Sequence, residues 1–223
     1  MTEWYVVGVD TGHTGALREA DHLLRALAVE LGLHDDVLGC THHVRDGRRP
    51  HTALSFALPS ERAARAAWLR LTTRIESGES GTVLGAGAGE DGRVGAGAVT
   101  GPGALLGVAF DGERHGPDEF AAGAAHAAAE HTARTGGRAV LYPGADAVTG
   151  VMTVGRLLDI SAVDRIAVLG SPEGASPERQ LVTRDHVRPE WRDGHLVLTA
   201  MPAAGGTLVP FEVPDPTPCC ADH

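Results

Sequence analysis

The sequence predicts an α/β chain of the α+β kind, with a ferredoxin-like sandwich domain followed by a smaller mixed α/β domain. In the first half, β-branched runs and amphipathic stretches follow the order β-α-β-β-α and are then joined by further apolar runs. After the Gly-Gly pair at 136–137, a second series of short strand and helix patterns begins. We therefore expect a ferredoxin-like, kinase-like domain at 1–136, a small mixed α/β domain at 137–213 and a Pro/Cys-rich tail at 214–223.

Each element of the first domain has its own signal. The run 4–9 is β-branched and aromatic and ends in polar residues, as a buried strand does. Residues 16–31 carry leucines at helical spacing and stop before Gly32. Two strands, 37–44 and 52–58, flank a turn that contains Asp46-Gly47, a strong hairpin signal. The other predicted elements are a helix from Ser60 to Ile75, strands at 82–84 and 105–110, and an Ala-rich helix at 119–135.

The second domain is predicted from shorter patterns. Strands are expected at 139–142, 165–169 and 208–213, with a helix at 153–160. The segments 186–192 and 195–200 flank Asp193-Gly194, which predicts a hairpin. The tail contains three prolines, which exclude a helix before Pro218.

Composition excludes several kinds of chemistry. All 19 basic residues are arginine, which excludes a Schiff-base lysine and the lysine of a phosphate-binding P-loop. The formal charge of −10 argues against a broad nucleic-acid interface, because such interfaces need clustered positive charge. There is no signal-peptide pattern and no apolar run long enough for a membrane span, and the three cysteines are not spaced as a disulfide framework. These features lead us to expect a cytoplasmic protein without a membrane partner; they leave the oligomeric state open.

Three blocks in the first 100 residues carry a resemblance to a known family. They are Val7-Gly8-Val9-Asp10-Thr11 with Thr14-Gly15, Gly39-Cys40-Thr41-His42-His43 with Pro50-His51-Thr52-Ala53-Leu54-Ser55, and the glycine-rich run 85–96. Together they resemble bacterial relatives of the tRNA 2-agmatinylcytidine synthetases. The resemblance implies an ATP- and magnesium-dependent ligase or kinase-like enzyme. One carboxylate stands where the family's strand-end motif has three acids, so we expect a diverged relative with an altered substrate.

The resemblance and the residue patterns point to one candidate nucleotide site. Asp10 to Gly15 connect a strand to a helix, where backbone N–H groups and the helix dipole favour an anion. The resemblance implies that Asp10 and Thr11 hold metal and phosphate, and that the later glycines approach phosphate. The candidate catalytic residues are Asp10, Thr11 and His13, and the candidate residues for ATP or another phosphate-bearing ligand are Thr14, Gly15, Gly85, Gly87, Gly89 and Asp91.

A second hypothesis is a non-catalytic metal-binding or assembly protein. Cys40 and His42 share a strand face, since side chains alternate along a strand, and His43 points the other way. The chain ends in two adjacent thiols and an imidazole, which suit zinc or another soft metal. The candidate metal ligands are Asp10 for magnesium, and Cys40, His42, Cys219, Cys220 and His223 for the softer metal. Structural roles remain the alternative for each of them: a capped turn at Asp10, a loop at 85–97, a core histidine at 42 and a frayed tail.

Overall fold

The chain folds as two units, Met1–Leu141 and Tyr142–His223. The computed structural model describes residues 4–12, 16–34, 36–45, 50–77, 107–171 and 173–213. The predicted strand at 82–84, the glycine-rich run and the Cys-Cys tail lie outside these residues. None of the described helices has the length and apolar character that crossing a bilayer requires.

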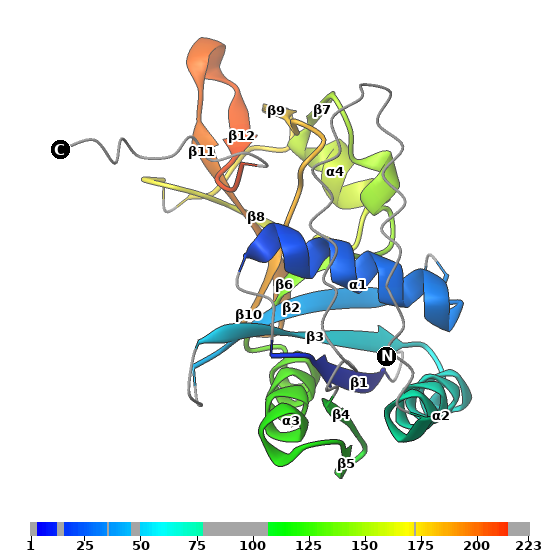
Figure 1. The fold of residues 1–223 in the computed structure, drawn as a ribbon. Coiled ribbons are helices and arrows are strands. Elements are labelled where there is room, and N and C mark those ends of the chain that lie inside the picture. The colour runs from blue at the N-terminus through cyan, green and yellow to red at the C-terminus, as the bar shows by residue number, and fades with distance from the viewer. Residues whose placement is uncertain are drawn as a thin grey trace, which may run out of the picture. The chain divides into compact units, whose positions relative to one another are not determined.

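The first unit has the predicted ferredoxin-like topology (Figure 1). Its elements are β1 (Tyr5–Asp10), α1 (Leu17–Leu31), β2 (Leu38–Val44), β3 (His51–Leu58), α2 (Glu61–Ser77), β4 (Gly107–Phe110), β5 (Glu113–His115), α3 (Asp118–Ala133) and β6 (Arg138–Leu141). The strands lie in the order β5-β4-β1-β3-β2-β6, and every neighbouring pair is antiparallel. The sandwich therefore carries two additional strands, β5 and β6, at its edges.

One face of this sheet holds the main hydrophobic core. Strand residues with alternating positions, such as Val7 and Phe56, pack against Leu24 of α1 and Trp68 of α2. Helix α1 ends as the sequence predicts, with Gly32 in the left-handed conformation at φ 67°. Because side chains alternate along a strand, every second residue packs against α1 and α2, and the residues between them point to the other face of the sheet.

Helix α3 covers that other face at very short range. A Cβ atom on Gly8 of β1 would lie 1.9 Å from the carbonyl oxygen of Ala124. A Cβ atom on Gly107 of β4 would lie 2.0 Å from the carbonyl carbon of Phe120. The glycines allow the helix backbone to rest directly on the strands, and this brings α3 side chains close to polar groups of the sheet.

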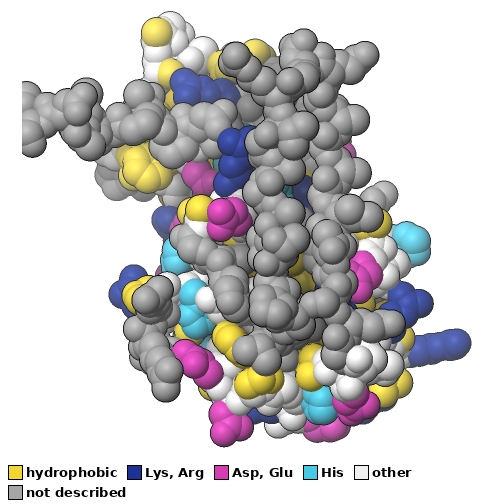
Figure 2. Space-filling model, in the orientation of Figure 1, with side chains coloured by type: hydrophobic (Ala, Val, Ile, Leu, Met, Phe, Trp, Pro, Cys, Tyr) yellow, Lys and Arg dark blue, Asp and Glu magenta, His cyan; other side chains and the backbone are white. Residues whose placement is uncertain are grey.

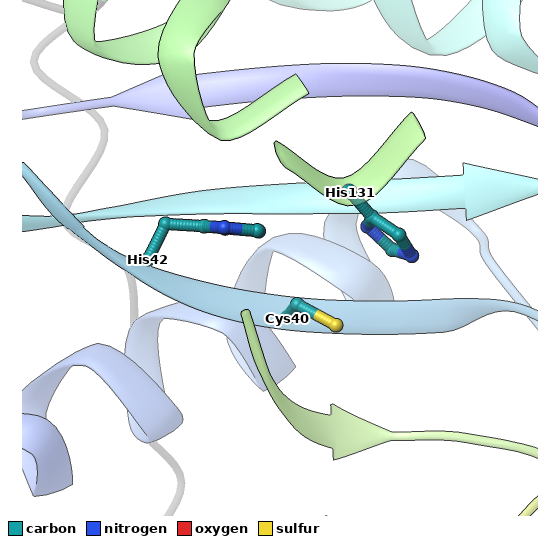
Figure 3. Close-up of side chains that lie close together, drawn as sticks. All are labelled: Cys40, His42 and His131. Atoms are coloured by element: carbon teal, nitrogen blue, oxygen red, sulfur yellow. The ribbon is translucent and has the colours of Figure 1, made fainter. Parts of the chain in front are cut away.

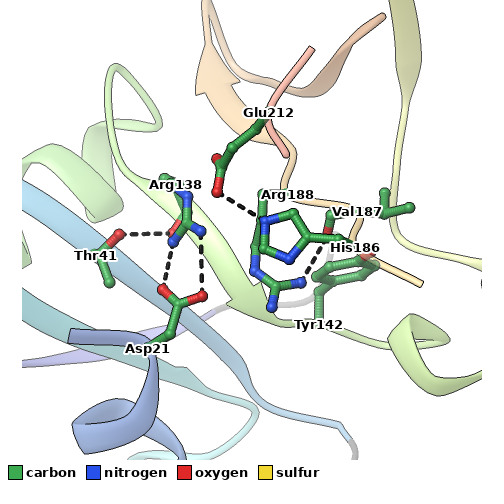
Figure 4. Close-up of polar contacts among 8 residues, drawn as sticks. All are labelled: Asp21, Thr41, Arg138, Tyr142, His186, Val187, Arg188 and Glu212. Carbon is green, nitrogen blue, oxygen red and sulfur yellow. Dashed lines mark hydrogen bonds and ion pairs between the residues drawn. The ribbon is translucent and has the colours of Figure 1, made fainter. Parts of the chain in front are cut away.

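A buried ion pair connects α1 to β6 in the first unit. The Arg138 guanidinium donates to the Asp21 carboxylate, with Nη2 3.1 Å from Oδ2, and the Thr41 hydroxyl donates to the Arg138 carbonyl oxygen (Figure 4). Both charged residues are buried. The pairing places β6 with the first unit, so the boundary follows Leu141, whereas the sequence placed it after Gly136.

The second unit is a mixed sheet with one short helix. Its elements are β7 (Val151–Thr153), α4 (Val154–Ile160), β8 (Arg165–Val168), β9 (Gln180–Val182), β10 (Glu190–Arg192), β11 (His195–Pro202) and β12 (Leu208–Pro210), with 3-10 turns at Ala145–Ala147 and Ala204–Gly206. Strand β11 pairs with β8 in parallel and with β10 and β12 antiparallel. The predicted hairpin is confirmed: Asp193 and Gly194 both have positive φ, 49° and 82°, as a two-residue hairpin turn requires.

Polar side chains tie this second unit together locally. The Tyr142 hydroxyl donates to the Val187 carbonyl oxygen at 3.2 Å, and burial raises the pKa of Tyr142 to about 12. His186 Nε2 lies 2.9 Å from a carboxylate oxygen of Glu212, as Figure 4 also shows. On the face in Figure 2, the visible Arg side chains lie among acidic, histidine and hydrophobic side chains.

Candidate metal centre

Three side chains that can bind metal meet between β2 and α3. Cys40 and His42 lie on the β2 face that α3 covers, and His131 comes from the last turn of α3 (Figure 3). Their potential ligand atoms all lie within 4.8 Å of one another, and the three residues are 0%, 1% and 3% exposed. This cluster could therefore hold a metal ion in the interior of the first unit.

Strand alternation and register explain why these groups meet. In the antiparallel pair of β2 and β3, Cys40 lies opposite Ser55 and His42 lies opposite Ala53. His43, one residue further along, is exposed on the other side, as alternation predicts. The small Ala53 packs with Ala127 of α3, which brings the end of α3 down onto this part of the sheet.

The cluster is part of a continuous hydrogen-bond chain. His42 Nδ1 lies 2.9 Å from Oε2 of Glu130, and His42 Nε2 lies 2.7 Å from the Ser55 hydroxyl oxygen. That hydroxyl also lies 2.6 Å from Nδ1 of His131. An ionised Glu130 accepts the proton of His42 Nδ1, so Nε2 is the acceptor for the Ser55 hydroxyl, and His131 Nδ1–H donates to the same oxygen.

Burial lowers the pKa of both imidazoles and so favours their neutral form. Loss of hydration lowers the pKa of His42, although the hydrogen bond to Glu130 opposes this effect. Complete burial, together with the nearby His42 and Arg134, holds the pKa of His131 well below its ordinary value. The hydrogen bond from His42 lowers the pKa of the half-buried Glu130. Neutral imidazole is the form that coordinates metal, because one ring nitrogen then has a free lone pair. The lowered pKa values therefore favour metal binding by these two histidines.

A glycine pair closes the cluster on the side of Glu130. A Cβ atom on Gly136 would lie 2.9 Å from a carboxylate oxygen of Glu130, and one on Gly137 would lie 2.4 Å from Cε1 of His42. Gly137 also has a φ of +106°, which side chains rarely adopt. Gly137 of the Gly-Gly pair therefore allows the backbone to pass directly over the His42 ring.

The chain of Glu130, His42 and Ser55 has the connectivity of an acid–histidine–serine triad, but its surroundings do not suit acyl transfer. Ser55 is 0% exposed, and its oxygen is already held by a second imidazole. A nucleophile needs a reacting carbon near its oxygen and donors for the developing oxyanion. The described residues around Ser55 offer no exposed face for such a substrate, whereas one thiol and two imidazoles are a common ligand set for borderline metals.

Asp10 occupies a different position under the same helix. Its carboxylate is 0% exposed, accepts the Gly12 backbone N–H at 2.8 Å and lies 2.8 Å from Nε2 of His51. A Cβ atom on Gly123 of α3 would lie 1.7 Å from Oδ2 of Asp10, so the carboxylate fills the space under that glycine. Burial raises the pKa of Asp10, and the His51 hydrogen bond partly offsets the rise. This carboxylate is thus held within the fold by Gly12 and His51.

The other predicted site residues are only partly described. Thr11 follows β1 and is partly buried. His13, Thr14, Gly15, Gly85, Gly87, Gly89 and Asp91, and the tail residues Cys219, Cys220 and His223, lie outside the described residues. The structure accordingly brings together two of the predicted ligands, Cys40 and His42, with Asp10 in a separate hydrogen-bonded group.

Sequence reasoning missed three members of the cluster. Ser55 could have been found from the hairpin, because a turn centred between Val44 and His51 places it opposite Cys40. Glu130 and His131 had no such signal, because α3 is rich in alanine on all sides and its sequence does not show which face meets the sheet.

Comparison of the chain with protein-family models, with curated proteins and with solved structures finds no match in any of the three.

Proposed function

We propose that this chain is a metal-binding protein in which Cys40, His42 and His131 hold a borderline transition metal, with zinc as the reference ion. The observation that carries the proposal is the convergence of one thiol and two imidazoles, all buried, with ligand atoms within 4.8 Å of one another. Thiolate and imidazole are the ligands that zinc prefers in proteins. A buried site of this kind serves to bind the metal firmly within the fold.

Glu130 supports this assignment from outside the ligand set. Metal-binding histidines usually donate their second ring N–H to a carboxylate or carbonyl, which fixes the tautomer and makes the other nitrogen a better ligand. Glu130 is placed to receive that proton from His42 Nδ1 at 2.9 Å. His42 Nε2 is then the nitrogen that faces the cluster.

The metal would have a structural effect on the first unit. Cys40 and His42 belong to β2 and His131 to α3, so an ion bound by all three joins the helix to the sheet. Binding to the folded but not the unfolded chain stabilises the fold, by about 2.7 kcal/mol when free metal is 100 times the Kd. We therefore infer that the metal fastens the end of α3 to the sheet.

The nucleotide hypothesis, with ATP and magnesium between the Asp10 loop and the Gly85 loop of a diverged synthetase-like enzyme, stays a prediction. The Gly85 loop lies outside the described residues. The Asp10 carboxylate already interacts with Gly12 and His51, so magnesium would have to compete for it. Stabilisation by ATP with magnesium, lost in Asp10→Ala, would support that hypothesis.

Cobalt(II) titration tests the metal-binding proposal, because cobalt reports thiolate coordination through its absorption and zinc displaces it. We expect one equivalent to bind the full chain, and we expect Cys40→Ser to abolish the thiolate absorption. The matched control is the Cys219→Ser/Cys220→Ser variant, which removes the other two cysteines of the chain. Retention of the signal in Cys40→Ser and its loss in the control would contradict the proposal and assign the metal to the tail.

A further inference from the structure

We propose that the Ser55 hydroxyl is a built-in competitor of the metal: it occupies the ligand nitrogen of His42 in the metal-free protein and must leave it when the ion binds. This inference rests on the proposed function and concerns the regulation of that same site. It is carried by the two hydrogen bonds of Ser55 and by the position of Glu130.

The first step concerns which nitrogen of His42 the metal can use. Nδ1 is engaged by Glu130 at 2.9 Å, and this carboxylate lies at the partly exposed edge of the cluster. Nε2 is engaged by Ser55 at 2.7 Å. An imidazole nitrogen has one lone pair or one proton, so a metal on Nε2 and a hydrogen bond from Ser55 to Nε2 exclude each other.

The second step concerns space. A zinc–nitrogen bond is about 2.0–2.1 Å long, so an ion on His42 Nε2 needs the region directly in front of that atom. The Ser55 oxygen is placed in that region, 2.7 Å from His42 Nε2 and 2.6 Å from His131 Nδ1. Ser55 thus occupies the region where an ion on His42 Nε2 would lie. Nδ1 of His131 carries the proton that it donates to Ser55, so an ion that binds this nitrogen must displace that proton as well.

Ser55 therefore has two effects. In the metal-free protein its hydrogen bonds hold both imidazoles in place, and the same hydrogen bonds lower the affinity of the site for metal. Removing the hydroxyl should remove the competition while leaving the thiol and both imidazoles in place. The hydrogen bond that competes with the metal, from the Ser55 hydroxyl to His42 Nε2, corresponds to about three- to tenfold in the dissociation constant. The wild-type ion should also be more readily exchanged than in a variant without this hydroxyl.

The test measures cobalt and zinc affinity by competition with a chelating indicator in wild type, Ser55→Ala and Glu130→Ala. We expect Ser55→Ala to bind about three- to tenfold more tightly and Glu130→Ala to bind more weakly. Ser60→Ala, an exposed serine of the same unit, is the matched control and should bind as wild type does. Equal or weaker binding by Ser55→Ala overturns the inference, and tighter binding by Glu130→Ala instead would place the metal on Nδ1.

A measurement on the wild type keeps the inference testable if Ser55→Ala folds poorly. Imidazole ¹⁵N NMR of the metal-free chain should show His42 protonated on Nδ1, and addition of zinc should shift its Nε2 to the metal-bound range. A metal-bound protein whose His42 Nε2 keeps its metal-free signal would overturn the inference. Absence of metal binding in every variant, wild type included, would be a failure of the proposed function itself.

Discussion

Acidification should destabilise the metal-free protein through His131. The pKa of this fully buried imidazole lies well below its ordinary value of 6.5 in the folded state. The unfolded chain therefore binds a proton that the folded chain does not, and stability falls as the pH drops through 6.5. Between pH 7.5 and 5.5, an imidazole that stays neutral in the fold costs about 1.4 kcal/mol. His42, whose pKa is lowered for the same reason, adds up to the same amount.

Urea denaturation at the two pH values, with a chelator present, measures this effect. We expect His131→Gln to lose about 1.4 kcal/mol less stability than wild type over this interval, because one titrating group is gone. His22→Gln, an exposed histidine on α1, is the control and should keep the wild-type difference. The opposing contribution of Asp10, whose pKa is raised, is common to these proteins and cancels. Identical pH dependence of wild type and His131→Gln would refute the reasoning.

The remaining predictions concern two packing features of the first unit. Gly137→Ala should destabilise the fold by about 1–3 kcal/mol and weaken cobalt binding, because its Cβ would meet the His42 ring. The control is Gly112→Ala, which has a positive φ but open space around it and should show only the backbone strain. Equal effects of the two substitutions in thermal unfolding and cobalt titration would contradict this account. Asp21→Ala should cost about 3–5 kcal/mol in urea denaturation, because it leaves Arg138 buried without its carboxylate, and a loss below 1 kcal/mol would show that water replaces the partner.

The topology of the first unit could be predicted because its signals are local. Strand periodicity, the stop at Gly32 and the turn between Val44 and His51 each depend on neighbouring residues, and together they define the ferredoxin-like order. Three-residue strands such as β5, β7 and β9 were not predicted, because they are too short to show a period.

Only the part of the candidate site that lies on strand β2 was predictable from the sequence. Alternation placed Cys40 and His42 on one face and His43 on the other. The third candidate ligand, His131, comes from a helix in which alanines lie on several faces, so the sequence did not indicate which side chains would meet the sheet. The docking of α3 is decided by Gly8 and Gly107, which permit a backbone approach that no periodicity records.

X-ray absorption at the zinc edge of the zinc-loaded full chain tests the central claim most directly, because it counts the atoms bound to the ion. Ligation by Cys40, His42 and His131 predicts one sulfur at about 2.3 Å and imidazole nitrogens at about 2.0–2.1 Å. A first shell without sulfur, or with the two sulfurs that Cys219 and Cys220 could supply, would contradict it.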